Sequence, residues 1–455
     1  MPQLWEKLSL YSCPKEPVQK VIERMVCAGW LWFNCVKAHP FLFEMDWGHG
    51  GGFGNVQMCA ALRTLIFPFQ LPGLRRYSLN IVGEDKLDAC FYVPKNSLQN
   101  LRIVALSVLR SNAIKRQRVR YPRFENAPRL RMLELCLPFD RYHDLKNLHF
   151  PWNQLTHLVI LDGLSLYGWR DIIRACPSLK RCYVVFEENA EPEGLDQDDS
   201  VDAKNQVLNP PKLEKLVDLT IACHRAIKSD TILDLQCPRL QELTLFSQHR
   251  YGGFSPTDQP SSFYRRTAPH LQVLALRQQA IPAFDVLRIL RMMPHLVELE
   301  IDCPGNYDPI LRELICLTPE RKPVATPVLA PRLRTLRLVA VNHQGMPSKS
   351  TFSAAPLIQA VQSRWWAGAD FDASEAPAIA YLDHVTIVHD ANHAPVVDHV
   401  TRELQRLVQW GLELVTVLQK TAQHWPHMTK VNLALPRHGD EQFEEWRREV
   451  LRRGE

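Results

Sequence analysis

The stretch Ala330–Leu338, with the sequence APRLRTLRL, determines how the chain folds. It consists of a small residue and a proline, followed one residue later by Leu-x-x-Leu-x-Leu. The same arrangement, with other apolar residues at some positions, returns along most of the sequence, and many successive copies start 24 to 31 residues apart. The copies begin at Leu62, Leu74, Leu101, Leu130, Leu155, Leu179, Leu216, Leu240, Leu271, Leu296, Leu333, Leu382 and Met428.

A period of this length is typical of leucine-rich repeats. In an extended segment successive side chains point to opposite faces, so the fourth and sixth positions of each copy lie on the same face. We therefore expect these positions to form the core. In the clearest copies they are Leu133 and Leu135, Leu158 and Ile160, Leu243 and Leu245, Leu274 and Leu276, Leu299 and Ile301, and Leu336 and Leu338.

Proline provides an independent test of this periodicity, because it was not used to find the copies. It stands two residues before the first leucine-like position in eight of the thirteen copies. With 33 prolines in 455 residues, chance would place proline there in about one copy. Proline lacks an N–H group and disfavours helix in the preceding residue, so it closes a helix before the next strand. The eight residues are Pro72, Pro128, Pro177, Pro238, Pro269, Pro294, Pro331 and Pro426.

Helical patterns precede several of these prolines. The segments Trp169–Ala175 and Phe284–Leu290 have apolar residues at helical spacing and run into Pro177 and Pro294. Each repeat is therefore expected to form a strand, a loop and a helix. Because single units cannot bury their apolar faces, the sequence predicts an α/β fold, a curved solenoid of irregular leucine-rich repeats with strands lining the concave side.

The domain organisation follows from the position of the repeats. Residues 1–58 are interpreted as a separate N-terminal segment, with a helix over Val18–Ala38 and a glycine-rich linker over Gly48–Gly54. Residues 59–455 form the predicted solenoid, interrupted by an acidic insertion at 187–211 that is expected to be disordered. A long helix is predicted from about Asp398 to Gln423.

Composition restricts the class of protein. The net charge of +5 is mild and does not indicate nucleic-acid binding. The twelve cysteines are irregularly spaced, and the N-terminus lacks the basic and then apolar order of a signal peptide. No apolar run is long enough for a membrane span. We expect an intracellular protein, cytoplasmic or nuclear, with reduced thiols and no membrane partner.

Catalytic and metal sites are not predicted. The sequence HGGGF at His49–Phe53 matches an esterase oxyanion loop, but the required Gly-x-Ser-x-Gly motif is missing, so a hydrolase remains a remote alternative. No cysteine and histidine set has zinc-ligand spacing, and no cofactor motif is found. Cys176 and Cys237 occupy the small-residue position of the repeat, where we expect buried hydrophobic side chains. The basic run Lys115–Arg123 is interpreted as a solvated loop, with contact to phosphates or to an acidic protein tail as the alternative.

A partner-binding surface is predicted on the concave side. If positions four and six face the core, positions three, five and seven project from the strands toward the partner. An acidic group beside an arginine there would suit a basic protein segment. The candidate residues are Arg181, Tyr183, Glu242, Phe246, Glu298, Glu300, Asp302 and Arg337.

The sequence also resembles a known family. Met1–Leu10, MPQLWEKLSL, is similar to the tail of an F-box, in which a Pro-x-Leu-Trp segment leads into the first strand. The repeat sequence WRDIIRACPSL, Trp169–Leu179, resembles those of fungal F-box proteins with irregular leucine-rich repeats. In that family the helices that bind the Skp-type cullin adaptor precede this tail. Either the natural start lies upstream of Met1, or the chain is a remnant that keeps the recognition repeats.

Three functions are therefore considered. The resemblance implies a non-catalytic substrate receptor of a Skp–cullin–F-box ubiquitin ligase, which binds a protein substrate on its concave face and binds the adaptor if an upstream F-box exists. The second is an interaction scaffold of leucine-rich repeats without ligase coupling. The third is the esterase-like hydrolase.

Overall fold

A computed structural model describes the main elements of the chain. The described residues are 7–11, 18–36, 39–47, 73–82, 98–109, 124–136, 149–164, 166–186, 211–223, 227–228, 235–247, 254–255, 262–277, 281–303, 305–317, 328–341, 350–370 and 379–418. They divide into two compact units, one within Met1–Val185 and one within Phe186–Leu433.

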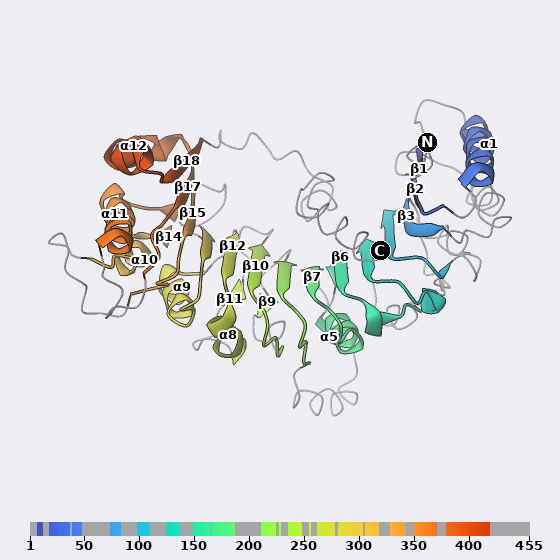
Figure 1. The fold of residues 1–455 in the computed structure, drawn as a ribbon, viewed down its shortest axis with the longest axis horizontal. Coiled ribbons are helices and arrows are strands. Elements are labelled where there is room, and N and C mark those ends of the chain that lie inside the picture. The colour runs from blue at the N-terminus through green and yellow to red at the C-terminus, as the bar shows by residue number, and fades with distance from the viewer. Residues whose placement is uncertain are drawn as a thin grey trace. The chain divides into compact units, whose positions relative to one another are not determined.

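The fold is mixed α/β, with an open parallel sheet whose strand order follows the chain (Figure 1). The first unit contains β1 (Lys7–Tyr11), β2 (Phe41–Trp47), β3 (Leu74–Val82), β4 (Ile103–Leu109), β5 (Met132–Cys136), β6 (His157–Leu164) and β7 (Arg181–Phe186). The second contains β8 (Asp218–Cys223), β10 (Glu242–Ser247), β12 (Val273–Arg277), β13 (Glu298–Asp302), β15 (Thr335–Ala340), β17 (His384–His389) and β18 (Glu413–Leu418). Two short parallel pairs lie outside this sheet, β9 (Ile227–Lys228) with β11 (Phe254–Ser255) and β14 (Gly305–Asn306) with β16 (Ser350–Thr351).

Helical segments connect many of the strands. The α-helices are α1 (Val18–Val36), α5 (Leu166–Ala175), α8 (Ser262–Thr267), α9 (Ala283–Leu290), α10 (Asp308–Glu313), α11 (Ala354–Asp370) and α12 (Ala394–Gln409). The 3-10 turns are η4 (Phe124–Asn126), η5 (Trp152–Gln154), η9 (Ala268–His270) and η10 (Ala391–His393). In the second unit the α-helices lie on one side of the strands, and the other side carries none of the described helices (Figure 1).

The predicted core positions are confirmed. All twelve side chains named above at positions four and six are at most 1% exposed. In the second unit they pack on the side that carries the helices, with Val286 and Leu290 of α9 and Leu404 of α12 among the buried helical residues. Parallel strands that are covered in this way bury continuous apolar rows.

The proline of the repeat lies in a tight turn before β5, β7, β10, β12, β13 and β15. In six described copies the N–H of the first leucine donates to the carbonyl three residues earlier, over 3.0 to 3.3 Å. Proline is the second residue of this turn, where its fixed φ is favourable and no N–H is needed. The donor and acceptor residues are Leu130 and Ala127, Leu179 and Cys176, Leu240 and Cys237, Leu271 and Ala268, Leu296 and Met293, and Leu333 and Ala330.

Each turn leads to a backbone connection with the preceding strand. In the second unit the carbonyl of one repeat accepts the N–H groups of two consecutive residues of the next repeat. For example, Val297 O accepts from Arg334 N at 2.8 Å and from Thr335 N at 3.0 Å. The same pair of bonds joins Val217, Gln241, Gln272 and Arg334 to the following repeats. The strands are therefore aligned by backbone groups at this edge.

The N-terminal segment contributes strands as well as a helix. The predicted helix over Val18–Ala38 is present as α1. β1 pairs with β2, and β2 pairs with β3, so residues before 58 extend the parallel sheet of the first unit. Aromatic rings replace leucine in this part of the core, as in the stacked pair Phe43 and Tyr77, whose centroids are 5.7 Å apart. The glycine-rich linker lies outside the described residues.

The prediction of one helix over Asp398–Gln423 was wrong. α12 ends at Gln409, and Glu413–Leu418 forms β18. Gly411 has a φ of +112°, and Leu412 N donates to Leu407 O at 2.9 Å, which closes the helix in the manner of a Schellman turn. The segment ELVTVL that follows contains β-branched residues, which favour a strand.

Candidate partner-binding site

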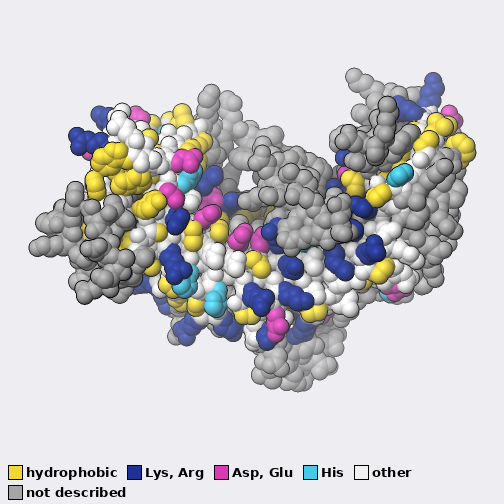
Figure 2. Space-filling model, viewed as in Figure 1, with side chains coloured by type: hydrophobic (Ala, Val, Ile, Leu, Met, Phe, Trp, Pro, Cys, Tyr) yellow, Lys and Arg dark blue, Asp and Glu magenta, His cyan; other side chains and the backbone are white. Residues whose placement is uncertain are grey.

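The candidate surface in the second unit is the sheet side opposite the helices, which we call the polar face. It is formed by positions three, five and seven of the repeats. Strand register places these positions in rows, so that Glu242, Val273, Glu298, Thr335, His384 and Glu413 are successive neighbours across β10, β12, β13, β15, β17 and β18. Figure 2 shows acidic side chains beside Lys, Arg and His side chains over these strands.

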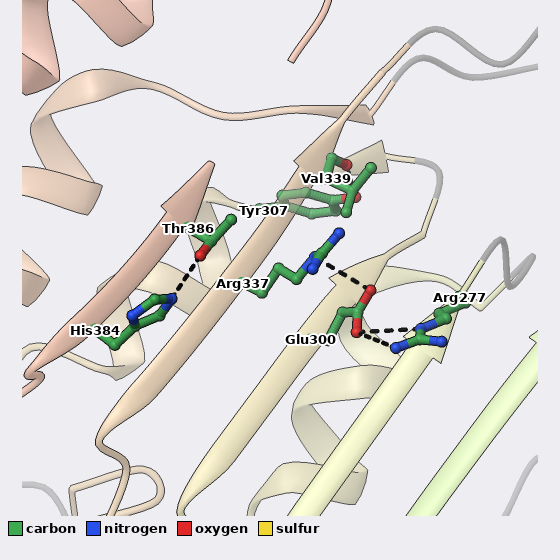
Figure 3. Close-up of polar contacts among 7 residues, drawn as sticks. All are labelled: Arg277, Glu300, Tyr307, Arg337, Val339, His384 and Thr386. Carbon is green, nitrogen blue, oxygen red and sulfur yellow. Dashed lines mark hydrogen bonds and ion pairs between the residues drawn. The ribbon is translucent and has the colours of Figure 1, made fainter. Parts of the chain in front are cut away.

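Glu300 lies between two arginines of neighbouring strands (Figure 3). Its Oε2 accepts hydrogen bonds from Arg277 Nε at 3.1 Å and Nη2 at 2.9 Å. Its Oε1 lies 3.4 Å from Arg337 Nε. The carboxylate is therefore neutralised within the protein, because strand register brings β12, β13 and β15 together. Half-exposed arginine pairs such as these contribute about 0.2–1 kcal/mol each.

Glu298 differs from the other predicted acidic residues of β13. Its side chain is exposed and forms no hydrogen bond or ion pair with the described part of the chain. Asp302, by contrast, is only 7% exposed. Of the three predicted carboxylates on this strand, Glu298 is the one that an external cation reaches directly.

The charge of the polar face opposes that of the whole chain. Positions three, five and seven of β8 to β18 carry six carboxylates and two guanidinium groups, a formal balance of −4 with His384 neutral. The complete chain has a net charge of +5. The face therefore attracts cations more strongly than the composition suggests. The eight groups are Asp218, Glu242, Glu298, Glu300, Asp302 and Glu413 with Arg277 and Arg337.

A second polar group lies on β17 and β18. His384 Nδ1 is 3.1 Å from Glu413 Oε2, and its Nε2 is 2.8 Å from Thr386 Oγ1. Carboxylate, imidazole and hydroxyl follow one another as in hydrolase triads. Thr386, however, is only 8% exposed and lies within a strand that pairs on both sides, so the surrounding backbone N–H groups serve the sheet rather than an oxyanion. The contacts fix the orientation of the histidine ring.

The structure brings four of the eight predicted site residues together on neighbouring strands. Glu298, Glu300, Asp302 and Arg337 lie on the paired strands β13 and β15. Glu242 and Phe246 lie on β10, which β12 separates from β13, and Phe246 is partly buried. Arg181 and Tyr183 are partly exposed on β7 of the first unit.

Several polar residues of the polar face were not predicted, among them Asp218, Arg277, His384, Thr386 and Glu413. The first four occupy positions three, seven, three and five of their repeats, so the position rule applied to every copy would have found them. Glu413 was missed because its strand was predicted to be helical.

The cysteines of the repeat turn are structural. Cys176 and Cys237 are at most 1% exposed, as predicted, and burial raises the pKa of both thiols to about 12. The nine cysteines in the described part of the chain are free thiols. Within the same residues, no group of three or more His, Cys, Asp or Glu side chains is placed to hold a metal ion.

Several motifs cannot be placed. His49–Phe53, Lys115–Arg123 and most of the acidic insertion lie outside the described residues. Among the described helices, none is long and apolar enough to cross a membrane.

No protein-family model matches the chain, and the curated proteins include no significant match.

Proposed function

We propose that this chain is a non-catalytic protein-recognition module built from irregular leucine-rich repeats in a curved solenoid, with the polar face on its concave side. The observation that supports the proposal is Glu298, an exposed carboxylate beside the ion-paired group of Arg277, Glu300 and Arg337. A basic segment of a partner protein would pair with Glu298, while the arginines offer donors to its backbone.

Charge reversal at Glu298 tests this proposal. Partners are captured by chemical cross-linking from cells that express the protein and are identified by mass spectrometry. Glu298→Lys should remove partners that contain basic segments. Glu403→Lys, which makes the same charge change at an exposed position of α12 outside the polar face, should retain them. Equal capture by both variants would contradict the proposal.

Glu300 needs a different substitution, because its carboxylate is already paired with arginines. Glu300→Gln removes the negative charge that pairs with Arg277 and Arg337 and makes the face less acidic at the same time. We expect it to weaken capture less than Glu298→Lys, since the exposed carboxylate of Glu298 remains. A larger effect of Glu300→Gln would mean that the ordered arginines, not Glu298, determine partner binding.

We further propose that the module is the substrate receptor of a Skp–cullin–F-box ubiquitin ligase. Support comes from the resemblance of Met1–Leu10 to an F-box tail that leads into a first strand, together with the position of β1 at Lys7–Tyr11. Co-purification with the Skp-type adaptor tests this, using the present chain and a version extended upstream to any in-frame start. Failure of both chains to bind the adaptor would leave the stand-alone interaction scaffold.

A further inference from the structure

The turn that precedes each strand presents a second repeated feature. Its third residue, directly after the proline position, is basic or histidine in five successive repeats of the second unit, before β8, β10, β12, β13 and β15. All five side chains are exposed. We call these residues the basic row: Lys215, Arg239, His270, His295 and Arg332.

The basic row is continuous because the strands that follow it are neighbours in the sheet. β8 pairs with β10, β10 with β12, β12 with β13, and β13 with β15. Since neighbouring strands lie about 4.8 Å apart, the five turns span about 19 Å. Figure 2 shows a row of Lys, Arg and His side chains along the lower ends of these strands. This edge is distinct from the polar face.

Within the turns themselves few opposing charges reduce the positive potential, and the exposed carboxylates of Glu242 and Glu298 stand three residues beyond Arg239 and His295. Arg332, His270 and His295 take part in no hydrogen bond or ion pair with the described residues. Glu214 is the carboxylate within the turns, and Lys212 binds it at 2.6 Å. Lys212, followed by Arg239 and Lys215, lowers the pKa of Glu214. Arg334, which is also exposed, adds a cation beside the last turn.

We infer that the basic row binds the phosphodiester backbone of a nucleic acid. A duplex carries one phosphate per about 3.4 Å of axis on each of its two strands, so a span of about 19 Å contains about five or six phosphates of each strand. These phosphates wind around the axis, and only a part of them faces the row at once. An extended acidic peptide places same-side carboxylates about 6.8 Å apart and offers about three over that distance. The duplex therefore presents the higher density of negative charge along the row.

The composition of the row also favours contacts with the phosphate groups of a nucleic acid. Contacts with particular bases, or with side chains of a protein partner, are favoured less. The turns expose cationic, imidazole and proline groups, such as Pro238, Pro269 and Pro294, without a large apolar anchor among them. Protein-binding surfaces depend on aromatic or aliphatic anchors, whereas phosphate binding requires positive charge. Binding is therefore expected to be independent of nucleotide sequence.

The test uses the purified full chain and a fluorescein-labelled DNA duplex of about 20 base pairs with arbitrary sequence. Fluorescence anisotropy gives the dissociation constant at several salt concentrations. Arg239→Glu with Arg332→Glu forms the row variant. Arg402→Glu with Arg406→Glu, at exposed positions of α12, makes the same change in net charge away from the row. Circular dichroism verifies that both variants are folded.

The four cations Lys215, Arg239, Arg332 and Arg334 would make about four phosphate contacts. A plot of the logarithm of the binding constant against the logarithm of the salt concentration should therefore have a slope of about −4 for the unaltered chain and for the α12 control. The row variant should bind at least about tenfold more weakly, with a slope reduced by about 2. Absence of salt-dependent binding, or equal affinities of the row variant and the control, would overturn the inference. A competition experiment compares polyglutamate with unlabelled DNA at equal total charge. If polyglutamate displaced the labelled duplex as effectively as unlabelled DNA, the inference would be overturned, and the partner would be an acidic protein segment.

Discussion

The buried side chain of Arg364 provides the most direct energetic test of the second unit. The residue lies on α11, has no exposed surface, and donates hydrogen bonds to three backbone carbonyls. Two of the distances are 3.0 Å to Leu314 O and 3.1 Å to Ala330 O, and the third acceptor is Leu329 O. Ala330 has a φ of +45°, so Arg364 holds a turn in which alanine has an unusual conformation.

The expected effect of Arg364→Met follows from two opposing contributions. A hydrogen bond from a charged donor stabilises by about 1.5–3 kcal/mol, so three of them contribute about 5–9 kcal/mol. Burial lowers the pKa of the guanidinium to about 10. That change corresponds to about 3 kcal/mol against the charged form. We therefore expect the substitution to lower the free energy of unfolding by about 2–6 kcal/mol.

Urea unfolding measures this loss, with tryptophan emission as the probe because Trp365 and Trp366 adjoin Arg364 in α11. Arg332→Met in the same turn region is the control and should change stability by less than about 0.5 kcal/mol, since its side chain is exposed. Arg364→Lys keeps the charge but lacks the planar fork, so it should lose at least as much stability as Arg364→Met. The reasoning would be refuted if Arg364→Met were as stable as the unaltered chain.

Three further outcomes are expected. Leu336→Ala, in the buried row of β15, should lower the free energy of unfolding by about 2–5 kcal/mol in urea titrations; a loss below about 1 kcal/mol would place this side chain outside the core. Gly411→Ala should cost about 1–2 kcal/mol in the same measurement because φ is +112° there, whereas an unchanged midpoint would argue against this helix end. Mass spectrometry after brief treatment with a maleimide at pH 8 should find label on the exposed Cys27 and not on Cys176, whose pKa of about 12 and burial keep it protonated and inaccessible; rapid labelling of Cys176 in the folded protein would contradict its position in the core.

The core of the fold could be predicted from sequence because two local signals coincide. Alternating leucines define the buried side of a strand, and proline marks the turn before it, so neither signal depends on distant residues. The turn around Pro331 and the burial of Leu336 and Leu338 both followed from this pairing. Glu298 was also placed correctly on an exposed part of the face.

The chemical state of the site could be predicted less completely. Whether Glu300 is available to a partner depends on Arg277 and Arg337, which belong to other repeats separated from it by insertions of different lengths. Their proximity follows from register, which sequence spacing does not specify. The end of α12 was missed for a different reason, because the apolar pattern continues through Gly411 and a single backbone conformation separates helix from strand.

The paired backbone hydrogen bonds at the start of the strands affect how the number of repeats in such a chain can evolve. Carbonyl groups such as those of Val217, Gln241 and Gln272 accept two N–H groups from the next repeat without any side-chain contribution. The junction between consecutive repeats is therefore chemically the same whichever residues flank it. Duplication or excision of a whole unit would rejoin the strands through identical bonds, so array length is free to vary while turn residues diversify.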